Sequence, residues 1–438
     1  MSGRTRAESR RLGARAEPRR AGTLAIAALL ALATVPAFAQ LVDTYFPSGL
    51  IGYRDELGVT VGSRARPEFD PEGIRAGSFI LRPDLGTGFG FGSNPTGHRP
   101  ARGSPFASNT GQLRVNSNWS SDNVAALFTV EDRRYLSLPS QSYTNWSGSL
   151  AKVFNLGASD KLLLGVEHLN LNQIPTAINT QTLDRPGAYR IDQARIAYET
   201  SLGDFNIQPQ LSFTTYRYDA VLSNRAILRQ ANRNRDVVDA QIVTKYSLAP
   251  LHDLLLVLRG ASIHYVNPDR GVPTKDANAV AVLAGIDLAA DAVWRLRALA
   301  GYQVRSFRSA GYRTASAPIA EVNVTFQPSG LTTITGTLTR SIEDAAAETS
   351  GSFTSTLARI TIDHELTRNI LLNAHADVQT AEYQGGGAET YTTMGTSVTW
   401  LMDRNLRLVG SYDYINKRPV TGSNLVDNQI LMKLMIGL

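Results

Sequence analysis

The sequence contains no cysteine. Disulfide bonds, thiol chemistry, thiolate metal sites and an N-terminal lipoprotein anchor are therefore excluded. Long apolar runs are also missing. After residues 21–37, no stretch reaches the roughly 20 apolar residues that a membrane-spanning helix requires. A helical membrane protein is therefore excluded for the rest of the chain.

Outside the N-terminus, neither basic nor acidic residues are in clear excess. The whole chain carries 44 basic and 38 acidic residues, a net charge of +6. Seven arginines and two glutamates lie within residues 1–39, which leaves 37 basic against 36 acidic residues. The high isoelectric point therefore does not indicate a nucleic-acid partner, and we expect none.

The N-terminus has the pattern of an export signal. Residues 1–20 are rich in arginine, residues 21–37 are apolar, and Ala37-Phe38-Ala39 is a small-x-small site. This pattern predicts a signal peptide over residues 1–39, used by the general secretory (Sec) route and cleaved before Gln40. The alternative is an N-terminal membrane anchor, but the apolar run is short and contains Pro36.

What the chain has in abundance is strict alternation of apolar and polar residues. Leu254, Leu256 and Leu258 share one face of a predicted strand, whereas Arg259 lies on the other face. From Trp294 to Arg305, every second residue is apolar, and three arginines lie among the residues that alternate with them. A strand with lipid on one side and water on the other has this pattern. The sequence therefore predicts an all-β fold, a transmembrane antiparallel β-barrel.

The number of strands and the lengths of their connections agree with each other. We predict eighteen strands from about residue 77 onward, with sixteen as the alternative, joined by eight short turns and nine longer loops. Eighteen strands with both termini on one side require these numbers, and short turns opposite long loops are typical of bacterial outer-membrane barrels. Soluble sandwiches, propellers and solenoids also have many short strands and remain the alternative.

The C-terminal strand ends in phase with the apolar row. Ile430, Met432, Leu434, Ile436 and Leu438 alternate with residues of the other face. Outer-membrane barrels typically end on such a strand, usually with phenylalanine, and Leu438 departs from that pattern.

Residues 40–76 do not have the pattern of a barrel strand, because the run that begins at Ser63 is charged and broken by prolines. It continues directly into Gly77-Ser78-Phe79. This block of about twenty residues resembles the N-terminal motif of the outer-membrane β-barrel porin type 2 family. The residues that match the motif are Arg64, Arg66, Pro67, Asp70, Pro71, Gly73, Gly77, Ser78 and Phe79.

The resemblance implies an outer-membrane barrel whose substrate is unassigned, and some family members are linked to exopolysaccharide production or export. It implies no catalytic residue. We expect residues 40–76 to be a periplasmic or plug segment and residues 77–438 to be the barrel. The charges of the motif could form a small plug or latch at the periplasmic mouth. Equally, the segment could be a spacer.

Nothing in the sequence indicates enzyme chemistry. None of the six histidines has metal-ligand spacing, and Gly385-Gly386-Gly387 lacks the lysine of a phosphate-binding loop. We therefore expect no catalytic, cofactor-binding or metal-binding residue, and no cofactor.

Charged residues on the predicted inner face are nearly balanced. Arg259, Arg295, Arg297 and Arg305 could form a basic ladder that favours anions. The alternative is internal pairing with Asp287 and Glu321. A further group of arginines in the loop 224–236 could touch lipopolysaccharide phosphates or be solvated: Arg225, Arg229, Arg233 and Arg235.

Together these patterns predict a porin-like protein of the bacterial outer membrane that lets small hydrophilic solutes pass. The alternatives are a component of exopolysaccharide export and a non-conducting structural or surface barrel. The expected partners are outer-membrane lipid and lipopolysaccharide, the barrel assembly machinery, and small hydrophilic solutes or polysaccharide.

Overall fold

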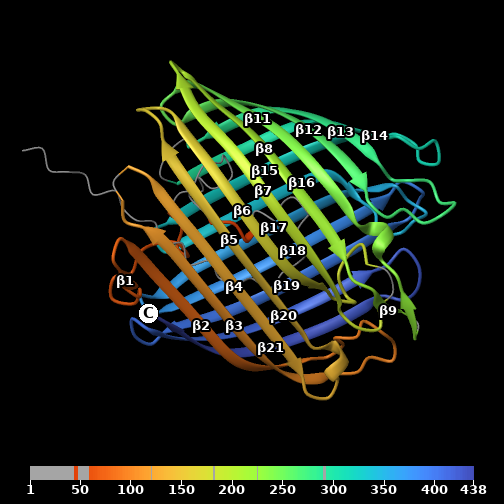
Figure 1. Ribbon diagram of the computed structural model, residues 1–438. Coiled ribbons are helices and arrows are strands. Elements are labelled where there is room, and N and C mark those ends of the chain that lie inside the picture. The colour runs from red at the N-terminus through yellow and green to blue at the C-terminus, as the bar shows by residue number, and fades with distance from the viewer. Residues whose placement is uncertain (1–43, 48–58, 120, 181–182, 224, 290–292) are drawn as a thin grey trace, which may run out of the picture.

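The computed structural model describes residues 44–47, 59–119, 121–180, 183–223, 225–289 and 293–438. The predicted signal peptide lies outside these residues. Within the described part, eighteen long strands form a closed, antiparallel barrel with tilted strands (Figure 1). The predicted strand number and fold class are confirmed.

Most strands have 12 to 16 residues, enough to cross a bilayer at a tilt. Three short strands, β1, β9 and β10, lie outside the set of eighteen. The strands are β1 Ile74–Ala76, β2 Phe79–Gly92, β3 Ser104–Ser117, β4 Asn123–Tyr135, β5 Tyr143–Asn155, β6 Lys161–Gln173, β7 Gly187–Leu202, β8 Phe205–Tyr218, β9 Val221–Ser223, β10 Ala226–Leu228, β11 Arg235–Ala249, β12 His252–Tyr265, β13 Ala277–Leu288, β14 Trp294–Phe307, β15 Ala315–Ser329, β16 Thr332–Asp344, β17 Ser352–Thr367, β18 Ile370–Tyr383, β19 Ala388–Leu401, β20 Leu406–Arg418 and β21 Leu425–Gly437. Two single-turn 3-10 helices, Pro139–Gln141 and Ala231–Arg233, lie in the long loops.

Each long strand pairs with its neighbour in the sequence, and β8 pairs directly with β11. The wall closes where β2 pairs with β21, from Asp84 opposite Gly437 to Gly92 opposite Gln429. Closure leaves no free sheet edge, which a membrane requires because lipid cannot satisfy open main-chain groups.

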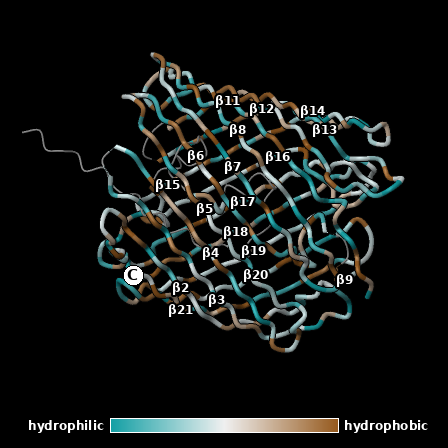
Figure 2. The backbone as a smooth tube through the Cα atoms, viewed as in Figure 1, coloured by the Kyte–Doolittle hydropathy of each residue, from teal (hydrophilic) through white to brown (hydrophobic). Residues whose placement is uncertain are grey.

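Hydrophobic and hydrophilic residues alternate along the strands, as the sequence predicts (Figure 2). On β12, Leu254, Leu256 and Leu258 are 42 to 43% exposed on the outer face, whereas Leu255 and Val257 point inward and are buried. The inner face is not polar throughout, because one inward area on β11–β15 is apolar. Its members are Val243, Leu255, Val257, Ala281, Leu283, Leu299 and Ile319.

The wall has two seams at which only glycine leaves room for the neighbouring main chain. A Cβ atom on Gly88 of β2 would lie 2.2 Å from the Met432 carbonyl oxygen across the closing seam. A Cβ on Gly301 of β14 would lie 1.9 Å from the Val282 carbonyl oxygen on β13. Eight strands separate β2 from β13 on one side and six separate β14 from β21 on the other. The two seams therefore lie on roughly opposite sides of the barrel.

Applied strand by strand, the alternation in the sequence predicts that the second long strand begins near Asn109, and this is wrong because β3 begins at Ser104. The first residues of β3, Ser104 and Pro105, are typical of a loop. The large apolar side chain that points inward there is Phe106, which is 1% exposed, and one such residue is too little to reveal a two-residue period. The described residues contain no helix that is long and apolar enough to cross a membrane.

Candidate functional site

The candidate site is the lumen, and ion pairs line its wall. Arg259 on β12 donates to both carboxylate oxygens of Glu321 on β15, and its Nε donates to Gln241 at 2.7 Å. Arg297 on β14 donates through its Nε to Asp287 at 3.0 Å. Arg305 pairs with Asp344 at the end of β16. The structure therefore places these arginines beside carboxylates.

The fourth member of the predicted ladder, Arg295, lies on the inward row of β14, two residues before Arg297, and is half-buried. The four residues do share one side of the lumen, on β12 and β14 with β13 between them. Their charge is nevertheless balanced locally, because Glu321, Asp287 and Asp344 lie among them.

Similar pairs occur around the rest of the wall. Arg359 on β17 donates to Asp377 on β18 at 2.5 and 3.1 Å. His375 on β18 lies 3.4 Å from Asp413 on β20. Arg407 pairs with Asp84 beside the closing seam. Buried charges require such partners, so the inner face is a network of paired charges.

At the end of the barrel with the short turns, the N-terminal motif lies along the rim, where Arg64 is beside Gly330 and Pro71 is beside Gly437. Arg66 is 8% exposed, and its Nη2 lies 2.8 Å from Glu365 on β17 and donates to the Val61 carbonyl at 2.8 Å. The main-chain N–H of Arg66 donates to the Asp70 carboxylate, which closes the turn around Pro67. Arg64 donates to the carbonyl of Gly330 in a short turn and lies 3.6 Å from Glu365.

The second half of the motif leads the chain into the wall. Pro71 lies against the C-terminal strand, since a Cβ on Gly437 would be 2.7 Å from its Cγ. Gly73 and Gly77 both have positive φ angles, 83° and 58°. Gly77 and Ser78 form the two-residue turn between β1 and β2, which glycine permits. Phe79 then packs against Trp119, with the ring centroids 5.6 Å apart.

A second feature lies inside the barrel, in the segment expected to be periplasmic or a plug, but its contacts with the wall were not predicted from the sequence. Residues 44–47 lie against the inward face of β5–β7, where Phe46 is 8% exposed and belongs to a buried cluster. The Ser149 hydroxyl donates to the Tyr45 carbonyl at 2.8 Å. An isolated Tyr-Phe pair in an irregular segment carries no periodic signal, so sequence reasoning had no basis on which to find it.

At the other end, the loop between β6 and β7 crosses the lumen. Asn179 is 5% exposed, and its side-chain amide donates to the Asp344 carbonyl at 3.0 Å. Its side-chain oxygen accepts from the Ala346 N–H at 2.9 Å and from the Tyr383 hydroxyl at 3.3 Å. Its main-chain N–H donates to Glu389 at 2.9 Å. These partners belong to the opposite wall, so the loop spans the opening.

Lys417 on β20 holds the same loop from another side. Its Nζ donates to the Ala177 carbonyl at 2.6 Å and to the Thr180 hydroxyl at 2.9 Å. We call residues 174–180, together with the facing residues 344–347, the cap.

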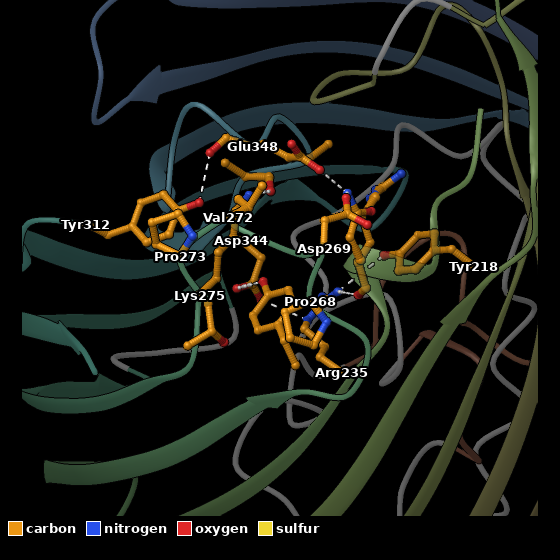
Figure 3. A pocket seen from close by; sticks show the side chains of 16 residues that line it. Tyr218, Arg235, Pro268, Asp269, Val272, Pro273, Lys275, Tyr312, Asp344 and Glu348 are labelled. Carbon is orange, nitrogen blue, oxygen red and sulfur yellow. Dashed lines mark hydrogen bonds and ion pairs between the residues drawn. The ribbon is translucent and has the colours of Figure 1, made fainter. Parts of the chain in front are cut away.

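The cap borders a small pocket at the ends of β8, β11, β12 and β16 (Figure 3). Asp344 lies there between two arginines: Arg235 Nε is 3.1 Å from its carboxylate, and Arg305 pairs with it too. Lys275 donates to the Ala345 and Ala347 carbonyls at 3.1 and 2.7 Å, and burial lowers the pKa of Lys275 to about 8. The free space of about 30 Å³ holds little more than one water molecule.

The arginines of the loop 224–236 divide into two groups, which corrects the reading of this loop as uniformly solvated or lipopolysaccharide-facing. Arg225 and Arg229 are exposed. Arg233 and Arg235 are 7% and 3% exposed, and their guanidinium carbons lie 4.0 Å from the rings of Tyr218 and Tyr216. Arg235 points inward because β11 begins there and sets its odd-numbered residues toward the lumen, whereas Arg233 is buried at the end of the 3-10 helix that precedes β11.

The part of the chain that the structure describes holds no group of three or more histidine, aspartate or glutamate side chains able to bind a metal ion. The lumen, with its paired charges and the cap across one end, is the candidate functional site.

Residues 66–436 match the family described as Putative beta-barrel porin 2. The chain belongs to this porin family, which is not an enzyme family. The resemblance noted in the N-terminal motif is thereby confirmed. We therefore take the chain as an outer-membrane barrel and call the end with the short turns periplasmic and the end with the long loops external. No curated protein matches the chain.

Several solved barrels are similar in shape at low identity. The outer membrane protein OpdK from Pseudomonas aeruginosa has 11% identity and a TM-score of 0.40, covering 82% of this chain and 99% of OpdK. The FrpB iron transporter from Neisseria meningitidis has 9% identity and a TM-score of 0.45, covering 81% and 64%. The siderophore receptor PirA from Pseudomonas aeruginosa has 8% identity and a TM-score of 0.42, covering 84% and 81%.

Proposed function

We propose that this porin-family barrel lets small hydrophilic solutes pass across the outer membrane through its lumen. The observation that carries the proposal is the inner face. It bears paired charges on strands all around the wall, whereas the outer face is apolar. Charged side chains are placed inside a barrel where water and polar solutes meet them, and barrels of this strand number enclose an aqueous space.

The pairing also bears on selectivity. A ladder of arginines without partners would favour anions, but Arg259, Arg297 and Arg305 each have a carboxylate within ion-pair distance. We therefore propose weak ion selectivity for the open lumen.

A second candidate is favoured by a specific observation, namely that the cap lies across the external end, with contacts to the wall opposite β6 and β7. A barrel held permanently in this state would be a non-conducting structural or surface protein.

Planar bilayer recording of the purified, refolded protein separates the two. The porin proposal expects discrete conductance steps and a reversal potential near zero in a salt gradient. The substitutions Arg297→Ala and Asp287→Asn should shift that potential in opposite directions, because they remove charges of opposite sign from the lumen. Absence of conductance in the wild type and in variants that loosen the cap would refute the channel and support the structural barrel.

A further inference from the structure

The inward face of β5–β7 contains an apolar notch. Four inward side chains form its walls: Ala151, Val153, Leu163 and Ala197, all at most 7% exposed. They alternate with lipid-facing residues such as Leu164, which is 42% exposed, so they belong to the lumen side of the wall. Two charged inward residues, Glu167 and Arg195, border the notch. The guanidinium of Arg195 lies 3.6 Å from the carboxylate of Glu167.

The notch is occupied by a side chain of the same protein. The ring of Phe46 lies among the four apolar residues. A Cβ on Gly165 would lie 2.4 Å from Cζ of Phe46, so glycine at this position makes room for the ring. The guanidinium carbon of Arg195 lies 3.9 Å from the ring centroid and covers its other face as a cation–π contact.

The residue before Phe46 is recognised separately. The Tyr45 carbonyl accepts a hydrogen bond from Ser149 on β5. The Tyr45 side chain packs at the edge of a second inward cluster that includes Tyr189 and Ile191 of β7. Tyr45 and Phe46, which precede the motif in the sequence, are therefore held at the wall by three contacts. These are the apolar notch around Phe46, the hydrogen bond from Ser149, and the packing of Tyr45 against the cluster that includes Tyr189.

We propose that residues 44–47 form a plug that binds reversibly in this notch, so that occupation of the notch by Phe46 sets the conductance of the lumen. At the periplasmic rim, Arg66 fixes the motif to Glu365. With the motif anchored there, plug release breaks the contacts of Tyr45 and Phe46 with the wall. This inference rests on the proposed channel function.

The first test removes the plug contact from either side. Phe46→Ala removes the ring, and Gly165→Ala fills the notch without changing the plug. Gly260→Ala on β12 is the matched control, because nothing lies within 4 Å of a Cβ there. Both test variants should raise single-channel conductance by about twofold, because removing the plug widens the polar path. The control should have the conductance of the wild type. Unchanged conductance in both test variants overturns the proposal.

A peptide with the sequence of residues 40–50 then tests recognition. Added on the periplasmic side, it should block the Phe46→Ala channel, whose notch is empty and intact. It should not block the Gly165→Ala channel, whose notch is filled. Equal block of both channels, or of neither, contradicts binding at the notch.

A second measurement does not depend on conduction and so separates failure of the plug from failure of the channel. The chain has no cysteine, so Ala197→Cys would place a single thiol in the notch, at a position that is 4% exposed. In the refolded protein, a water-soluble maleimide should label this thiol on the order of tenfold faster when Phe46→Ala is also present, because the ring no longer covers it. Equal labelling rates would overturn the plug whether or not the barrel conducts.

Discussion

At the residue scale, the N-terminal motif shows how one charge can fix a segment to the barrel. Arg66 and Glu365 are both nearly buried, whereas Arg368 and Glu68 form an exposed pair with the atoms 3.3 Å apart. Removing one partner of a buried charge pair leaves the other partly desolvated, and removing one partner of an exposed pair costs little.

Arg66→Ala should therefore lower the unfolding free energy of the barrel by about 1.5–3 kcal/mol, as expected for a lost hydrogen bond to a charged group. Arg368→Ala is the control and should change it by less than about 0.5 kcal/mol. Urea unfolding in detergent, followed by tryptophan fluorescence, gives both values. Equal effects of the two substitutions would show that Arg66 is not the anchor.

Lys275 gives stability a pH dependence of defined sign. Burial lowers its pKa to about 8 in the folded protein, against 10.5 in the unfolded chain. Between these values the unfolded chain binds more protons, so stability should rise with pH. The rise from pH 8 to 10.5 should be about 3 kcal/mol. Subtracting the profile of Lys275→Met isolates this contribution, and parallel profiles would contradict it.

Contacts between individual side chains were the least predictable part of the structure from the sequence. Sequence reasoning named Asp287 and Glu321 as alternative partners of the basic ladder, because residues on neighbouring strands face each other at predictable positions. It did not find Asn179, Lys417 or Phe46. Their partners lie on distant strands or in loops, and no periodicity relates them.

At the scale of elements, the strands were predictable because lipid and water on opposite faces impose a two-residue period. The predicted start of a strand is wrong where that period is hidden, as at Ser104 and Pro105 at the start of β3. The loops follow no such rule. The loop that follows β6 was expected only to be long, yet its position is fixed by contacts with β16, β18, β19 and β20.

The cap should open when Asn179 loses its side chain. Asn179 has a φ of 52°, so Asn179→Gly removes three side-chain hydrogen bonds while keeping a main-chain conformation that glycine adopts readily. At about 1 kcal/mol for each bond, the open population should rise on the order of 100-fold. Protease added to whole cells should then cut the loop faster. The exposed Arg225, with a φ of 63°, supplies the control Arg225→Gly, which should be cut as slowly as the wild type.

At the scale of the whole molecule, closure of the wall depends on the glycine seams. A Cβ on Gly88 would meet main-chain atoms of β21, which cannot move without opening the seam, whereas nothing lies within 4 Å of a Cβ on Gly410. Gly88→Ala should therefore destabilise the barrel by about 1–3 kcal/mol, as overpacking does. Gly410→Ala should be neutral. The folded fraction on unheated SDS gels, measured against urea, tests both, and equal fractions would contradict the role of the seam.

The position of Tyr45 and Phe46 behind the wall has a consequence for the lifetime of the protein in the cell. Proteases usually begin at exposed chain ends and loop tips, where they can draw out an extended stretch. Here Tyr45 and Phe46 lie against the inner face of β5–β7, and Arg66 is fixed to Glu365 at the rim. Proteases of the cell envelope therefore cannot reach Tyr45 and Phe46 while Phe46 fills the notch. A barrel that loses its plug also exposes a site for its own degradation.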